Sequence, residues 1–269
     1  MNILDGRVAI VTGAGRLRGI GRAAAVALAE LGADVAVTGT GRDPQAFPYD
    51  EKATGWRDVE STAEQIRACG RRTLALQADV SRGEDAQRVV ESTRETLGRV
   101  DIVVNNAALS RGADRAPITE LSEDLWRRVI EVKLTGSFLM CRAAVPAMVS
   151  QASGGSIINV SSIAGKRGYA NATAYCAANA GLQGFTQALA VELAQHGIRV
   201  NAVCPGLTDT SRMDDLGRAE QWEQRIRQLI PLGRAATDIE VGRFIAWLAT
   251  PDASYITGQS INFDGGAIA

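Results

Sequence analysis

Short apolar runs alternate along the chain with longer stretches in which apolar residues recur every three or four positions. The short runs have the length and the Val and Ile content of buried strands, and the longer stretches have the spacing of amphipathic helices. Strands are predicted at Arg7–Thr12, Asp34–Thr38, Arg72–Gln77, Val100–Asn105, Ser156–Ser161, Ile198–Cys204 and Gln259–Phe263. Helices are predicted at Gly19–Leu31, Arg57–Cys69, Gly83–Leu97, Ser122–Met148 and Thr173–His196, the fourth of them bent or ended near Pro146.

This order of elements indicates an α/β protein with a seven-stranded parallel sheet that helices cover on both faces. Right-handed crossovers make such a sheet doubly wound, and its ligands bind at the carboxyl edge of the strands. We expect one domain spanning residues 1–269, since no linker divides the chain. Two stretches break the alternation. Gly39–Gly55 is longer than a usual βα loop, and Leu207–Pro231 is a loop-and-helix excursion placed to cover a site.

The composition is that of an ordinary globular protein, with 46% hydrophobic and 22% charged residues among 269. A net charge of −1 argues against nucleic acid as the main partner, because proteins that bind it usually carry a basic excess or patch. The basic residues are 26 arginines and only three lysines, Lys52, Lys133 and Lys166. Codon usage in a GC-rich genome explains the arginine excess, but it does not explain where the lysines lie.

The cysteines and the single histidine give no sign of a metal site. Cys69, Cys141, Cys176 and Cys204 lie far apart, without the spacing of a zinc or redox motif. We find no signal peptide and no run of the ~18 apolar residues that a membrane helix needs. These observations favour a cytoplasmic protein with free thiols and no membrane partner.

A glycine-rich loop joins the first predicted strand to the first predicted helix. It reads Gly13-Ala14-Gly15-Arg16-Leu17-Arg18-Gly19-Ile20-Gly21. Glycines let backbone N–H groups approach a pyrophosphate, which the partial positive charge of a helix amino terminus also attracts. The strand-to-helix context supports dinucleotide binding and a three-layer, doubly wound Rossmann fold. The cofactor-binding candidates in the loop are Gly13, Arg16, Arg18, Gly19, Ile20 and Gly21.

The end of the second predicted strand bears on the choice between NAD(H) and NADP(H). NAD-binding sheets usually place Asp or Glu there, to hold the ribose hydroxyls. This chain has no acid there before Asp43. Arg16, Arg18 and Arg42 are near, and guanidinium groups suit a 2′-phosphate, so NADP(H) is favoured over NAD(H). The alternative is that these arginines are solvated loop residues.

Short motifs in a fixed order carry a resemblance to the short-chain dehydrogenase/reductase family, in its single-domain form. They are Thr12-Gly13…Gly19-Ile20-Gly21, Asp79-Val80, Asn105-Asn106-Ala107-Ala108, Ser161-Ser162, Tyr175, Pro205-Gly206 and Thr257-Gly258…Asp264-Gly265-Gly266. The resemblance covers the chain from Arg7 to Gly266. It implies an oxidoreductase that interconverts a carbonyl and a secondary alcohol. The further cofactor-binding residues that it implies are Arg42, Asp79, Val80, Asn105, Ala107, Pro205, Gly206 and Thr208.

Two departures from the family pattern concern the cofactor region. The glycine loop has two more residues between Gly13 and Gly19 than is common, and the motif after the fourth strand ends in Ala108 where glycine is usual. Neither is expected to abolish cofactor binding, but the longer loop leaves the phosphate contacts open.

A third departure concerns catalysis. The resemblance implies a tetrad of Asn, Ser, Tyr and Lys, in which the tyrosine and the lysine form a Y-x-x-x-K motif. Here Tyr175 is followed by Asn179 at the lysine position. Lys133 stands at the asparagine position of the preceding long helix. The two residue types are therefore exchanged.

The exchange can preserve the chemistry. A tyrosine has an ordinary pKa near ~10, and a nearby cation lowers it by about 1–3 units. We expect Ser162 to hydrogen-bond the substrate oxygen and Tyr175 to act as the acid/base. Lys133 would lower the pKa of Tyr175, and Asn179 would orient the cofactor ribose or a water. The alternatives are that Lys133 is a surface lysine in a slow or inactive protein, or that it donates the proton itself.

The substrate is not readable from the sequence. Its determinants are expected in Ser110–Pro117 and Leu207–Pro231. We expect the charges of Arg111, Asp114 and Arg115 to be solvated, with recognition of a polar substrate as the alternative. In the second stretch, Met213 and Trp222 either cap an apolar substrate or pack the excursion.

Two other functions remain open beside an NADP(H)-linked oxidoreductase acting on a small carbonyl or alcohol. One is a cofactor-binding protein with weak or no redox catalysis, and the other is a non-redox lyase or isomerase on the same fold. The family resemblance also implies a homotetramer or homodimer. It would be built from the two long helices and the last strand.

Overall fold

A computed structural model describes the backbone of residues 2–216 and 220–268, and the side chains of these residues except 215, 216, 220–222 and 225. In this part of the chain seven parallel strands form one sheet, in the order β3-β2-β1-β4-β5-β6-β9. The predicted doubly wound α/β fold is confirmed. The strands are β1 (Val8–Val11), β2 (Asp34–Gly39), β3 (Thr73–Gln77), β4 (Ile102–Asn105), β5 (Gly155–Val160), β6 (Ile198–Pro205) and β9 (Ser260–Phe263).

The strand β1 shows why the predicted strands are continuously apolar. Successive side chains of a strand point to opposite faces of the sheet. Val8 and Ile10 pack in the core on one face, and Ala9 and Val11 pack in the core on the other. All four are at most 1% exposed. Because helices cover both faces, a polar side chain at any of these positions would be buried without a partner.

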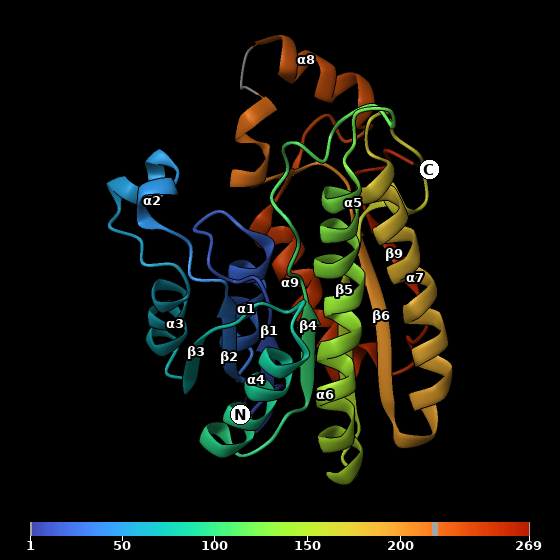
Figure 1. The fold of residues 1–269 in the computed structure, drawn as a ribbon. Coiled ribbons are helices and arrows are strands. Elements are labelled where there is room, and N and C mark those ends of the chain that lie inside the picture. Colours follow the sequence, from blue (N-terminus) through green and yellow to red (C-terminus); the bar gives the residue numbers. More distant parts are fainter. Residues whose placement is uncertain (1, 217–219, 269) are drawn as a thin grey trace.

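The helices form the two outer layers. One face of the sheet is covered by α1 (Ile20–Glu30), α3 (Val59–Ala68) and α9 (Asp238–Ala249). The other face is covered by α4 (Gly83–Leu97), α6 (Gly136–Ser150) and α7 (Thr173–Leu193). Figure 1 shows α4, α6 and α7 in front of the sheet and α9 behind it.

The sequence analysis missed α9, although its amino terminus carries a signal. Thr237 Oγ1 accepts a hydrogen bond from the backbone N–H of Glu240, and the Glu240 side chain accepts one from the backbone N–H of Thr237. This reciprocal pair is a capping box, whose sequence form is Thr or Ser followed three residues later by Glu. The helix approaches α1 closely, since a Cβ on Gly242 would lie 2.6 Å from the Ala23 carbonyl carbon.

The fourth predicted helix is present, but it does not end at Pro146. α5 (Glu123–Ile130) continues through a π-helical segment, Glu131–Thr135, into α6, and Pro146 lies inside α6. Proline removes one backbone hydrogen bond, whereas burial of Ala144 and Ala147 against the sheet holds the helix on both sides of it. The irregular turn is therefore eleven to fifteen residues earlier than predicted. Such π-helical turns occur frequently at functional sites.

The same long helix corrects the expectation that no segment is apolar enough to cross a membrane. An 18-residue window within Glu123–Ser150 has a mean hydropathy of 1.3, which suffices by length and composition alone. Half of that window is buried inside the protein, because side chains such as Met140 and Met148 pack on the sheet. It is a core helix and not a membrane span.

Both stretches that break the alternation lie over the carboxyl edge of the sheet, where ligands of such sheets bind. The first contains α2 (Tyr49–Ala53). The second contains a 3-10 segment, Ser211–Leu216, and α8 (Glu220–Leu229). Figure 1 shows α2 and α8 above that edge. A small parallel sheet of β7 (Thr208–Asp209) and β8 (Ala236–Thr237) joins the two ends of the second stretch.

Candidate active site

The glycine-rich loop between β1 and α1 is held against the segment that follows β4. Thr12 Oγ1 accepts hydrogen bonds from the backbone N–H groups of Asn106 (3.0 Å) and Ala107 (3.1 Å). Asn106 Nδ2 donates to the carbonyls of Thr12 and Gly13, both at 2.9 Å. Gly13 has a φ of +66°, and a Cβ there would lie 2.8 Å from the Ala107 Cα. The close approach of the two backbones therefore requires glycine.

The first turn of α1, which begins at Ile20, has the geometry of a pyrophosphate site. A Cβ on Gly21 would lie 2.5 Å from the Gly13 carbonyl oxygen, so the loop passes close over the helix amino terminus. The backbone N–H of Gly19 donates to Asp238 Oδ2 at 3.0 Å, and Arg22 pairs with the same carboxylate. The residues present fit a dinucleotide, because tight glycine turns at a helix amino terminus bind phosphate.

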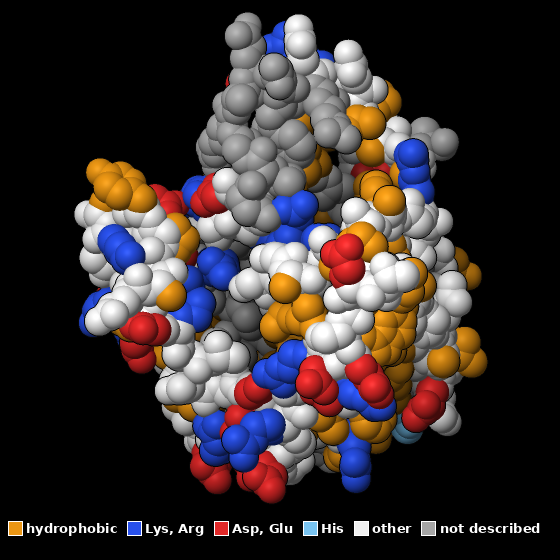
Figure 2. Space-filling model, turned by 45° about the horizontal axis from the view of Figure 1, so that its top comes forward, with side chains coloured by type: hydrophobic (Ala, Val, Ile, Leu, Met, Phe, Trp, Pro, Cys, Tyr) orange, Lys and Arg blue, Asp and Glu red, His pale blue; other side chains and the backbone are white. Residues whose placement is uncertain are grey.

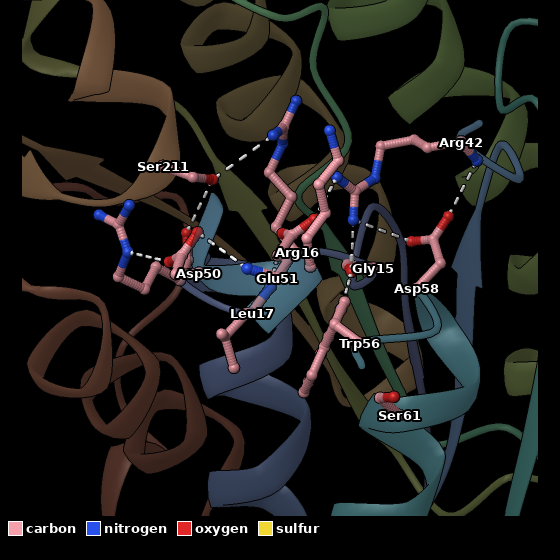
Figure 3. A network of polar contacts seen from close by, with 12 residues as sticks. Gly15, Arg16, Leu17, Arg42, Asp50, Glu51, Trp56, Asp58, Ser61 and Ser211 are labelled. Atoms are coloured by element: carbon pink, nitrogen blue, oxygen red, sulfur yellow. Dashed lines mark hydrogen bonds and ion pairs between the residues drawn. The ribbon is translucent and has the colours of Figure 1, made fainter. Parts of the chain in front are cut away.

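The long stretch after β2 folds onto this loop instead of extending into solvent. Glu51 on α2 is fully buried, and its Oε1 accepts a hydrogen bond from the backbone N–H of Leu17 at 3.0 Å. Trp56 Nε1 donates to the Gly15 carbonyl at 2.6 Å. Figure 3 shows these contacts converging on the glycine loop. The sequence indicated only an unusually long loop. It did not predict that this stretch packs over the glycine loop.

Two of the three arginines assigned to a 2′-phosphate are already paired with carboxylates. Arg18 binds Asp50 at 2.6 Å and Asp214 at 2.5 Å. Arg42 binds Glu51 at 2.8 Å and lies over the Phe47 ring, 4.5 Å from its centroid. These two arginines therefore hold α2 and the excursion in place.

Arg16 is different. Its guanidinium donates to the hydroxyls of Ser110 (3.1 Å) and Ser211 (3.5 Å), and no carboxylate pairs with it among the described residues. Burial and, next, the charge of Arg42 lower the pKa of Arg16. Figure 3 shows its side chain beside Ser211, between the glycine loop and the second excursion. Of the three arginines, Arg16 is therefore the one without a carboxylate partner among the described residues.

Asp58 supplies a carboxylate where the sequence shows none. A Cβ built on Gly39, at the end of β2, would lie 3.5 Å from Asp58 Oδ1, and one on Gly15 would lie 1.5 Å from it. Asp58 Oδ2 accepts a hydrogen bond from the Arg42 backbone N–H at 3.0 Å. Asp58 has a φ of +53°, a conformation that costs free energy in a residue with a Cβ. No sequence signal predicts this placement, since Asp58 begins the next helix.

Other predicted cofactor residues lie at the ends of β3 and β4. Asp79 pairs with Arg128 of α5 at 2.6 Å, and Val80 packs on Gly136 of α6. Asn105 is 2% exposed, and its Nδ2 donates to Asn159 Oδ1 at 2.9 Å. The Asn105 side chain therefore ties β4 to β5 inside the sheet.

The segment after β6 reaches the same edge of the sheet. Pro205 ends β6, and the backbone N–H of Gly206 donates to the Phe263 carbonyl at 3.0 Å. Thr208 is 6% exposed, and its Oγ1 donates to the Gly206 carbonyl at 3.4 Å. These residues form the wall between the sheet and the second excursion.

The end of β5 is fastened to the first turns of α7, which carries Tyr175. Gln183 Nε2 donates to the Ser162 carbonyl at 3.1 Å, and Ser161 Oγ donates to the Asn179 carbonyl at 3.1 Å. Ser162 is buried, and Tyr175 is half-buried. These bonds hold the end of β5, at the carboxyl edge of the sheet, against α7.

Asn179 is fully buried one turn after Tyr175. Its Nδ2 donates to the Tyr175 carbonyl at 2.8 Å. Its Oδ1 is a buried acceptor that has no hydrogen-bond partner among the described residues. A buried acceptor without a donor costs free energy, so this position suits a hydroxyl, a water or an ammonium group.

Lys133 is not a surface lysine. It lies in the π-helical segment, is 5% exposed, and has no carboxylate or hydrogen-bond partner for its Nζ within the described residues. Burial, and then the charge of Arg212, lower the pKa of Lys133 to about 7. The segment packs on α7, since a Cβ on Gly181 would lie 2.8 Å from Leu134 Cδ2. Lys133 is therefore a buried base next to the helix of Tyr175, although no hydrogen bond joins the two side chains.

The charges after β4 are not solvated as expected. Asp114 is 2% exposed and pairs with Arg115, whose guanidinium carbon lies 4.2 Å from the Tyr175 ring centroid. Arg212, which the sequence analysis overlooked, lies over the same ring at 5.0 Å. Their positions depend on how two distant loops pack, which no local pattern encodes.

Of the two residues proposed to cap a substrate, only one can be placed. Met213 is half-buried in the 3-10 segment of the second excursion, and the side chain of Trp222 lies outside the described residues.

Comparisons with known proteins agree with this fold and motif order. The family model described as enoyl-(acyl carrier protein) reductase matches residues 13–267. The short chain dehydrogenase/reductase astE of Aspergillus oryzae is 42% identical over 267 residues, which cover 98% of this chain and 95% of that protein. A 3-oxoacyl-[acyl-carrier-protein] reductase of Synechocystis is 39% identical and covers 100% of this chain and 99% of its own.

A solved structure extends the likeness to three dimensions. Carveol dehydrogenase from Mycobacterium avium, in complex with NAD, superposes with a TM-score of 0.84 at 29% identity, covering 100% of this chain and 99% of that chain. The matches span nearly the whole chain. The chain therefore belongs to the short-chain dehydrogenase/reductase family and is an oxidoreductase.

Proposed function

We propose that the protein interconverts a carbonyl and a secondary alcohol by hydride transfer, with Tyr175 as the acid/base. The observation that supports the proposal is that the end of β5, which carries Ser162, is hydrogen-bonded to α7, which carries Tyr175, in a chain whose glycine loop fits a dinucleotide. The bound nicotinamide supplies the hydride to the carbonyl carbon, or accepts it in the reverse direction. Tyr175 gives its proton to the carbonyl oxygen, and Ser162 Oγ donates a hydrogen bond to that oxygen.

In this proposal Lys133 performs the role of the family's lysine, and Asn179 performs the role of the family's asparagine, each from the other's position. The Lys133 ammonium attracts the negative charge that develops on the Tyr175 oxygen as the proton leaves it. Asn179 keeps Oδ1 available for a ribose hydroxyl or a water, which supplies the donor that this buried acceptor lacks. The burial of Lys133 supports the proposal, because water screens the charge of a buried lysine less than that of a surface lysine.

NADP(H) remains our proposal for the cofactor, and Arg16 is the residue that supports it. Arg18 and Arg42 are neutralised by carboxylates, whereas Arg16 has only hydroxyl partners among the described residues. One observation favours NAD(H) instead. The Asp58 carboxylate lies beside the end of β2, where an acid would hold the ribose hydroxyls and repel a 2′-phosphate.

The setting of the reaction is also a proposal. The chain works as one domain in the cytoplasm, and the excursion at 207–231 covers the substrate. We propose a homotetramer or homodimer, because large apolar side chains remain exposed on the long helices and near β9. They include Trp126, Phe138, Val191, Trp247 and Tyr255.

The reaction itself is tested with purified protein, NADPH or NADH, and a panel of ketones and secondary alcohols. We expect absorbance loss with at least one ketone. Tyr175→Phe should reduce turnover by about 100-fold or more, because it removes the proton donor and leaves the ring in place. Tyr169→Phe, on the exposed loop before α7, is the matched control and should retain activity. Binding of the cofactor without oxidation would favour a non-catalytic protein, and product without cofactor oxidation would favour a lyase or isomerase.

The exchange of Lys and Asn is tested by single and double variants. Lys133→Ala should lower kcat by about 10- to 1,000-fold, because it removes the charge proposed to stabilise the Tyr175 oxygen as its proton leaves. The reversal Lys133→Asn/Asn179→Lys should recover activity that Asn179→Lys alone does not. Full turnover by Lys133→Ala would contradict the role assigned to Lys133.

The buried charge of Lys133 predicts a pH-dependent cost to stability. Its folded pKa, about 7, lies below the ordinary value of 10.5, so the cost is largest below pH 7 and fades as the pH rises toward 10.5. Lys133→Met should therefore be more stable than the wild type at about pH 6.5. This advantage should shrink by about 2 kcal/mol by about pH 9, at about 1.4 kcal/mol per pH unit. Denaturant unfolding measures it, and the exposed Lys52→Met should show no such trend.

The choice of cofactor is tested by comparing NADPH with NADH in two variants. Arg16→Ala should lower kcat/KM for NADPH by about 10- to 100-fold and affect NADH less, because a charge-assisted hydrogen bond contributes about 1.5–3 kcal/mol. Arg57→Ala removes an exposed arginine and should change neither value. A wild type that prefers NADH, and loses NADH activity in Asp58→Asn, would instead assign the selection to Asp58.

A further inference from the structure

Basic side chains gather round Tyr175 at the carboxyl edge of the sheet. The guanidinium carbons of Arg115 and Arg212 lie 4.2 Å and 5.0 Å from the centroid of the Tyr175 ring. Arg212 is also near Lys133 and Arg16, since its charge adds to burial in lowering the pKa of both. Figure 2 shows Lys and Arg side chains gathered in the hollow on this side of the molecule.

The carboxylates nearby do not balance these charges. Asp114 neutralises Arg115. Within the described residues, however, neither Lys133 nor Arg212 has a carboxylate partner, and Arg16 reaches only hydroxyl groups. Elsewhere at this edge the arginines are matched, as Arg42 is with Glu51. Among the described side chains, Lys133, Arg212 and Arg16 therefore form a group of cations near Tyr175 that have no carboxylate partner.

Such a surplus is costly unless a ligand supplies the opposite charge. Lys133 is 5% exposed and Arg212 is half-buried, so water screens their repulsion only in part. Buried charges in folded proteins are usually paired. An anion placed between these groups would remove the repulsion and gain charge-assisted hydrogen bonds.

The pyrophosphate of a dinucleotide does not account for this charge. Its site is the amino terminus of α1, at Gly19 and Gly21, where backbone N–H groups and the helix dipole supply the attraction. Arg115 and Arg212 lie over the ring of Tyr175 instead. In the proposed reaction the hydroxyl group of Tyr175 donates a proton to the substrate. The charge is therefore placed where the substrate binds.

We infer that the substrate is a small carbonyl compound, or the corresponding alcohol, that carries a carboxylate or phosphate group, and that Arg212 binds this group. Arg115, which lies over the same ring, is already neutralised by Asp114. Guanidinium recognises both anions through paired hydrogen bonds. The inference rests on the proposed function, because it locates the anion by its distance from the acid/base Tyr175.

Binding tests the inference without requiring turnover. The probes are 2-oxobutanoate, acetoacetate and 4-oxopentanoate, each compared with its methyl ester, and dihydroxyacetone phosphate compared with dihydroxyacetone. With the oxidised or reduced cofactor present, the shift in Tm gives the affinity of each probe. We expect at least one anion to bind about tenfold or more tightly than its neutral partner. The carboxylate and phosphate arms distinguish the two sources of charge.

Variants then assign the selectivity to a residue. Arg212→Gln removes the charge of a side chain that makes no ion pair among the described residues, so the fold should be retained. We expect it to reduce the preference for the anion over the neutral probe to about one, with the cofactor affinity unchanged. Arg167→Gln is the matched control, because Arg167 is exposed and lies over a different tyrosine ring, that of Tyr169.

The outcomes test the anionic substrate and the proposed reaction separately. Equal binding of anionic and neutral probes by the wild type, or an unchanged preference in Arg212→Gln, overturns the inference. A loss of cofactor affinity in Arg212→Gln, with the preference unchanged, assigns Arg212 to the pyrophosphate and overturns it as well. Reduction of neutral ketones alone would leave the proposed oxidoreductase standing without an anionic substrate. Tight anion binding with no turnover of any probe would sustain the inference and count against the proposed reaction.

Discussion

Charge at the carboxyl edge of the sheet has to be neutralised within a largely buried setting, and most of the site follows from that constraint. The buried Glu51 accepts from the Leu17 backbone and pairs with Arg42, so α2 and the glycine loop hold each other in place. Arg18 does the same for the second excursion through Asp214. These pairs are partly removed from water, where an unpaired charge would be costly. The two excursions are thus fixed by electrostatics as much as by apolar packing.

For the same reason, cations near the site that have no carboxylate partner indicate a functional role. Among the described residues Lys133, Arg212 and Arg16 lack carboxylate partners, whereas Arg18, Arg42 and Arg115 are paired. A buried lysine without a partner is costly to folding, so its retention implies a use. The π-helical turn at Glu131–Thr135 places Lys133 against α7 without interrupting the long helix. Asn179 on α7 is buried and neutral, so that position adds no second buried cation.

Much of the architecture could be predicted because it is repetitive and local. Each strand is a short run that is apolar at every position, since both faces of the sheet are covered, as Val8–Val11 illustrates. Gly13 and Gly21 mark the phosphate loop because no larger residue fits between β1, α1 and Asn106. By contrast, α9 was missed although Thr237 and Glu240 form its capping box, and the end predicted at Pro146 was wrong because burial on both sides outweighs one lost hydrogen bond.

By itself the sequence determined the doubly wound sheet and the glycine loop, and it singled out Ser162, Tyr175, Lys133 and Asn179 as candidates, since each is a matter of residue type and spacing. Tertiary structure alone decided which charges are neutralised. Asp58 reaches the end of β2 from the start of α3, and Arg115 and Arg212 meet on one ring from loops almost a hundred residues apart. The physical reason is that pairing of charges depends on distance in space, and long loops carry no periodicity from which that distance can be derived.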